Sequence, residues 1–127
     1  MQSWISWFEI PAIDLDRAKK FYDAIFQMDT QILDFGGFKM GMFPHQGEGG
    51  AGAVGAALCQ HESYQPSATH GTLVYLNANP DLQTVLDRIE AAGGAILRPK
   101  TQISPEYGYM AIFIDSEGNR MALHSNQ

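Results

Sequence analysis

Glu9 and His124 each carry an ionisable side chain within a run of residues that predicts a β-strand. A carboxylate and an imidazole together are suited to general acid–base chemistry. Glu9 lies in the run WISWFEI, where strand alternation puts it on the same face as Trp7. His124 lies in NRMALH and shares its face with Ala122. Trp7 adds a flat apolar surface that suits an organic molecule. These four residues are therefore candidates for a ligand-binding face.

A third strand is expected to contribute Val74 to this face. The run GTLVYLN, residues 71–77, is apolar and β-branched enough to predict a strand. If Leu73 and Tyr75 pack on a helix, strand alternation directs the side chains of Thr72, Val74 and Leu76 to the opposite face, which is the expected ligand-binding face.

Two helices are expected to position these strands. Asp14 is a candidate N-cap, and Leu15, Ala18, Tyr22 and Ile25 follow it at helical spacing. A second helix is predicted to start at Asn79-Pro80 and to stop at Gly93-Gly94.

The predicted elements follow the order βαβββ twice, which indicates an internal repeat in a single domain over 1–127. The first module covers about 1–60 and the second about 70–127. Aligning Leu15 with Leu82 places Trp7 on Val74 and Gly55 on Ala122. The glycine-rich segment 44–52 is expected to be a mobile loop.

Composition narrows the class of function. The formal net charge is -6, so nucleic acid and anionic membranes are disfavoured partners. No apolar run is long enough for a transmembrane helix, and the N-terminus lacks the pattern of a signal peptide. The single cysteine, Cys59, favours a reduced thiol and a cytoplasmic protein. His45, His61 and His70 lie in or beside predicted loops, which disfavours a metal cluster built from them.

Three segments together resemble the vicinal oxygen chelate superfamily, which includes glyoxalase I, extradiol dioxygenases and bleomycin-binding proteins. They are FEIPAIDLDRAKKFYDAIF, LDRIEAAGG and FIDSEGNRMALH, and in this order they cover nearly the whole chain. The resemblance implies an α+β fold of two βαβββ modules, whose curled mixed sheets surround a cavity with helices outside. It also implies a homodimer, as do sheet edges that need covering.

The metal enzymes of that superfamily carry His, Glu or Gln ligands on the first and last strand of each module. The corresponding positions here are Trp7, a residue near Gly55, Val74 and Ala122. Indole N–H is only a donor, and Gly, Val and Ala side chains have no lone pair. No metal and no other cofactor is therefore expected.

The sequence is compatible with three functions. The favoured one is a small-molecule binding protein with a metal-free cavity lined by Trp7, Glu9, Val74, Ala122 and His124. The second is a metal-independent lyase or isomerase that uses Glu9 and His124 as acid and base. The third and least favoured is a metal-dependent lyase of the glyoxalase I type.

Overall fold

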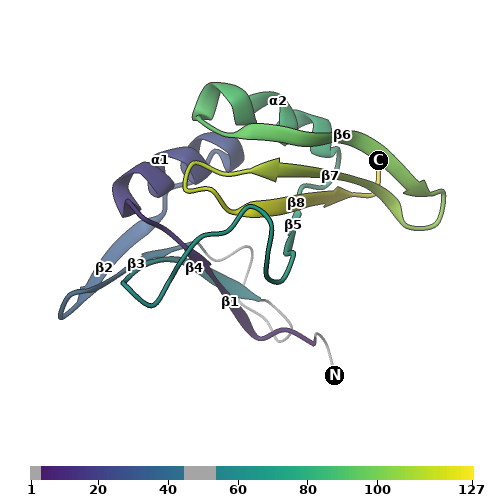
Figure 1. The fold of residues 1–127 in the computed structure, drawn as a ribbon. Helices are drawn as coiled ribbons and strands as arrows, with labels where there is room; N and C mark the ends of the chain where they lie inside the picture. Colours follow the sequence, from purple (N-terminus) through teal and green to yellow (C-terminus); the bar gives the residue numbers. More distant parts are fainter. Residues whose placement is uncertain (1–3, 45–53) are drawn as a thin grey trace.

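The computed structural model describes residues 4–44 and 54–127 and confirms the α+β fold. Two four-stranded mixed sheets are each accompanied by one helix (Figure 1). The elements are β1 (Trp7–Pro11), α1 (Leu15–Phe26), β2 (Gln31–Phe35), β3 (Phe38–Met42), β4 (Gly55–Gln60), β5 (Tyr75–Asn77), α2 (Leu82–Ala92), β6 (Ala95–Ser104), β7 (Gly108–Ile114) and β8 (Arg120–Ser125). The loop predicted over 44–52 lies, apart from Pro44, outside the described residues.

The two sheets repeat one strand order. Sheet A runs β1-β4-β3-β2 and sheet B runs β5-β8-β7-β6. In each, the first strand pairs parallel with the last strand of its module, and the remaining pairs are antiparallel. The βαβββ repeat predicted from the helix phase is therefore present.

The helices form where caps and apolar periodicity coincide. Asp14 caps α1 by accepting from the Arg17 N–H at 3.1 Å. For α2, the predicted start at Asn79-Pro80 is wrong, because Asp81 is the N-cap and accepts from the Gln83 N–H at 2.9 Å. Asn79 instead bonds outside the helix, where its amide oxygen accepts from Asn126 N.

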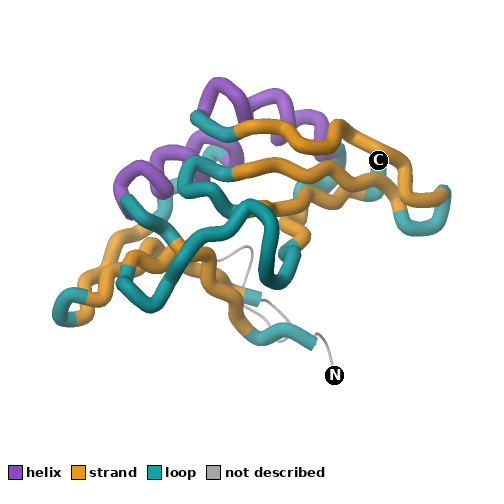
Figure 2. The backbone as a smooth tube through the Cα atoms, in the orientation of Figure 1, coloured by secondary structure: helices purple, strands orange, loops and turns teal. Residues whose placement is uncertain are grey.

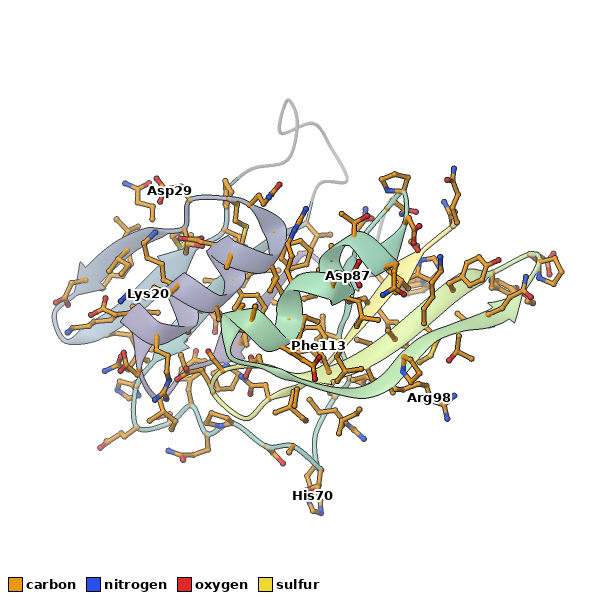
Figure 3. All side chains as sticks on the ribbon, turned by 90° about the horizontal axis from the view of Figure 1, so that it is seen from above. Lys20, Asp29, His70, Asp87, Arg98 and Phe113 are labelled. Atoms are coloured by element: carbon orange, nitrogen blue, oxygen red, sulfur yellow. The ribbon has the colours of Figure 1, made fainter. Side chains whose placement is uncertain are left out.

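Both helices lie side by side on the same side of the molecule, and the sheets extend from beneath them (Figures 1 and 3). The core joins the two modules through one cluster, with Phe21, Tyr22 and Ile25 from α1 and Phe113 and Leu123 from sheet B. Within the described residues, the backbones of the sheet A strands do not approach those of the sheet B strands closely. Each sheet therefore keeps one face directed away from the helices, called here its open face.

The turn between β7 and β8 ties the second module to the first. The buried Glu117 carboxylate accepts from Asp14 N at 2.7 Å and from Arg17 Nε at 2.7 Å. Asp115 accepts from the buried Tyr22 hydroxyl at 2.7 Å, and Asn119 Nδ2 donates to Pro11 O at 2.7 Å. The DSEGN motif thus sets how β1 and α1 sit against sheet B.

A long linker, residues 61–74, crosses between the two sheets after β4 (Figure 2). It is bonded to β8, because Ser67 O accepts from Arg120 N at 3.1 Å. The strand predicted over 71–77 is shorter than expected, since only Tyr75–Asn77 pairs. No helix among the described residues is long and apolar enough to cross a membrane.

Candidate functional site

Trp7 occupies the place where a side chain of residue 55 would stand. Trp7 and Gly55 are direct partners in the β1–β4 pair. A Cβ built on Gly55 would lie 2.8 Å from Cε3 of Trp7 and would be even closer to Cζ3. The indole therefore covers the β4 backbone, and the absence of a side chain at Gly55 makes that contact possible. Trp7 as a whole residue remains 39% exposed on the open face of sheet A.

Glu9 shares this face with Trp7, and donors bond both of its carboxylate oxygens. Trp7 Nε1 donates to Glu9 Oε2 at 3.2 Å, and the Tyr64 hydroxyl donates to Glu9 Oε1 at 2.5 Å. The second distance is typical of a charge-assisted O–H···O⁻ bond. On the other side of the strand, Ile10 is buried in the core. Strand alternation thus correctly predicts the faces of Trp7 and Glu9.

Tyr64 belongs to the linker and is the residue of this site that sequence reasoning missed. Its ring meets Phe38 edge-on, with centroids 5.5 Å apart, and the His61 ring lies 5.1 Å from that of Phe38. These neighbours hold the phenol over β1. The bond to the Glu9 carboxylate raises the pKa of Tyr64 to about 12, so the hydroxyl stays a donor at neutral pH. The signal that the sequence offered for Tyr64 was an aromatic residue within a polar linker.

Cys59 lies buried beside this group. It pairs with Met40 on β3 and with Pro11 on β1, two strand positions along from Glu9. Burial raises the pKa of the Cys59 thiol to about 12, and the negative charge of Glu9 adds to that effect. The thiol is therefore protonated, and it lies close enough to the Glu9 carboxylate to act as a weak donor to it.

The predicted face of Val74 is wrong by one residue. Val74 packs against the hydrophobic core, and Leu76 is part of it. Tyr75, 50% exposed, is the residue that pairs with Ala122, just as Trp7 pairs with Gly55. The distance in sequence from Tyr75 to the N-cap Asp81 is one residue shorter than the distance from Trp7 to the N-cap Asp14. The strand alternation is therefore shifted by one residue, and Tyr75 rather than Val74 takes the position that corresponds to Trp7.

His124 lies on β8 next to Ala122 but does not meet Glu9 within the chain. Its Nε2 lies 2.7 Å from Tyr107 O, and because a carbonyl only accepts, Nε2 carries the hydrogen. The strands of Glu9 and His124 belong to different sheets, and the backbones of β1 and β8 do not approach each other closely in the described structure. Ala122 is fully buried on the same face as His124.

The residues at the expected metal positions do not fit a metal. Trp7, Gly55 and Ala122 offer no ligand atom, and the Tyr75 phenol is a single one where a divalent ion needs several. No group of three or more His, Cys, Asp or Glu gathers within residues 4–44 and 54–127. His70 points outward from the linker (Figure 3).

A shallow groove of about 380 Å³ lies at the end of sheet A and touches the Glu9 group through Tyr64. Its polar lining is largely committed elsewhere: Gln60 Oε1 accepts from Leu15 N, and His61 Nδ1 accepts from Ser63 N. We therefore place the candidate site on the open face at Trp7 and Glu9. The groove is lined by Ala12, Ile13, Gly37, Gln60, His61, Glu62, Tyr64 and Gln65.

Comparison with known proteins agrees with this architecture. The family model of the Glyoxalase/Bleomycin resistance protein/Dioxygenase superfamily matches residues 4–123, and the chain belongs to that superfamily. A search of curated proteins finds no significant match.

Solved structures share the fold at low sequence identity. A glyoxalase/bleomycin resistance protein from Albidiferax ferrireducens T118 is 17% identical with a TM-score of 0.73, over 98% of this chain and 100% of that one. A genomically encoded fosfomycin resistance protein from Listeria monocytogenes is 20% identical with a TM-score of 0.66, over 100% and 94%. A glyoxalase I mutant from Zea mays is 20% identical with a TM-score of 0.70, over 95% of this chain and 46% of that one.

Proposed function

We propose that this protein binds a small organic molecule on the open face of sheet A, without a metal ion. The observation that carries the proposal is the Trp7 indole lying across Gly55. The resemblance to the superfamily implies that its metal enzymes carry ligands at these two positions, where this chain has an aromatic surface. An exposed aromatic ring with a carboxylate beside it suits binding of an organic molecule, because the ring supplies apolar area and Glu9 supplies orientation.

Binding is favoured over acid–base catalysis because the proposed acid and base lie on separate sheets. A lyase or isomerase that used both Glu9 and His124 would need a second copy of the chain to bring them together. His124 Nε2 is also engaged by the Tyr107 carbonyl. Catalysis by Glu9 alone as a base is distinguished from binding by measuring turnover rather than affinity.

A thermal-shift screen with a diverse set of small molecules tests the proposal. Compounds that raise the melting temperature should lose affinity when Trp7 is changed to Ala, by about 2 kcal/mol, or roughly 30-fold in Kd. Trp4→Ala is the matched control, because Trp4 is 90% exposed and lies before β1. Equal losses in both variants would place the site elsewhere. Turnover of a stabilising compound that Glu9→Gln abolishes would favour the enzyme instead.

A further inference from the structure

Glu9 is a carboxylate without a cationic partner in the described structure. Its two oxygens accept from Trp7 and Tyr64, which are both neutral donors, so the negative charge remains. The ion pairs found within residues 4–44 and 54–127 engage Glu117, Asp23, Asp29 and Asp81, and none of them reaches Glu9. Glu9 is moreover exposed at the surface of the sheet, where a ligand can reach it.

The surroundings of Glu9 are aromatic and apolar. Trp7 and Tyr64 both contact the carboxylate through their polar edges, which fixes the position of the two rings. Phe38 supports Tyr64 from β3. By the register of sheet A, Met40 and Met42 stand on the same face as Phe38. The faces of aromatic rings carry partial negative charge and attract cations.

We infer that this site binds an organic cation, namely a compact ammonium or quaternary ammonium group on a small apolar body. This inference rests on the proposed function. The carboxylate supplies the opposite charge, and the rings supply contact for carbon-bearing substituents that a hydrated inorganic cation lacks. A divalent metal ion does not fit, because no group of three or more His, Cys, Asp or Glu side chains gathers around Glu9 in the part of the chain that the structure describes. The net charge of -6 repels anionic ligands and favours the approach of cations.

Choline and its neutral carbon isostere, in which a quaternary carbon replaces the nitrogen, provide the test. The two probes match in shape and differ in charge. Binding is measured by NMR on the ¹⁵N-labelled Trp4→Phe variant, where Trp7 is the one remaining tryptophan. Its indole N–H, which bonds Glu9, reports on the site directly. Sodium chloride at the same ionic strength serves as the blank. Choline should shift this signal and bind about tenfold more tightly than the isostere.

Two charge-matched variants assign the effect to Glu9. Glu9→Gln should weaken choline binding at least about tenfold and leave binding of the isostere within about twofold. Glu90→Gln removes the same charge from an exposed position on α2, and it should leave the binding of both probes unchanged. Equal affinity of the two probes, equal effects of the two variants, or no shift of the Trp7 signal overturns the inference. If a neutral compound from the thermal-shift screen still binds through Trp7, the proposed function survives and the charge preference alone is wrong.

Discussion

At the scale of single residues, the pairing of a tryptophan with a glycine defines the candidate site. Trp7 can lie flat on β4 because Gly55 has no side chain, and the two residues are direct partners in the β1–β4 pair. The position of the Trp7 ring therefore depends on the glycine at residue 55.

Gly55→Ala should displace the Trp7 ring, because the new Cβ would overlap it. Ligands found in the screen should bind more weakly by about 1–2 kcal/mol, and tryptophan fluorescence should change in the Trp4→Phe background. A double-mutant cycle with Trp7→Ala measures the coupling, and in the double variant Gly55→Ala should cause no further loss. Additive losses would show that the two residues act independently.

Cys59 should be unreactive in the folded protein. Burial and the nearby Glu9 carboxylate raise the pKa of the thiol to about 12, so the reactive thiolate is scarce at about pH 8. Labelling with a thiol reagent should be at least about 100-fold slower for the native chain than for the chain in urea. Rapid labelling of the native protein would show that Cys59 is accessible and ionised.

At the scale of elements, the β7–β8 turn connects the two modules through Glu117. Burial alone would raise the pKa of this carboxyl group, but the Arg17 guanidinium, the Asp14 N–H and the Ser116 hydroxyl outweigh burial and lower it. The ion pair itself is half exposed on the Arg17 side, so its contribution is discounted for screening by solvent.

Glu117→Gln should destabilise the fold by about 2 kcal/mol at neutral pH, because the buried bonds from Arg17 and Asp14 lose their charged acceptor. Since the folded pKa is lowered, this stabilisation is present above the unfolded value of 4.5 and is lost as pH falls through the folded pKa. Urea unfolding between about pH 7 and about pH 3 checks both points. The gap between wild type and variant should narrow toward the acidic end, whereas a constant gap would contradict the assignment.

At the scale of the whole molecule, the open faces and edges of both sheets lead to two expectations. Sheet A ends in β1 and β2, and sheet B ends in β5 and β6, so each sheet has two edge strands. Exposed Trp7, Phe35 and Tyr75 lie on these strands. Such edges and apolar side chains are commonly covered by association.

We expect a homodimer in solution. A second copy would cover the exposed edges and could bring sheet A of one chain against sheet B of its partner. Sedimentation equilibrium should give twice the chain mass of 14.0 kDa. A stable mass near 14.0 kDa at high concentration would reject the dimer.

We also expect the purified protein to lack stoichiometric Ni, Zn, Fe or Mn. The reason is the chemistry of the donor set at Trp7, Gly55, Tyr75 and Ala122, where one phenol is the single ligand atom. Elemental analysis after gel filtration measures this directly. One bound equivalent of any of these metals, together with chelator-sensitive turnover of the methylglyoxal–glutathione adduct, would mean that other residues form a metal site.

The sequence by itself was enough for the fold class, the βαβββ repeat, the first helix and the shared face of Trp7 and Glu9. These features depend on local periodicity, capping and strand alternation, which neighbouring residues determine. The family also followed from local motifs, because the DSEGN turn and the α1 segment are contiguous in sequence.

Only the tertiary structure decided which residues meet. The Tyr64 hydroxyl bonds Glu9, from which it is separated by 55 positions in the sequence. The spacing between β5 and α2 places Tyr75, and not Val74, on the open face. The separation of Glu9 from His124 likewise depends on how α1 packs against α2, which sets the two sheets apart. Such contacts follow from the packing of distant segments and from exact loop lengths. A difference of one residue in the length of a loop exchanges the side chains on the two faces of the following or preceding strand. No local pattern in the sequence indicates such a difference.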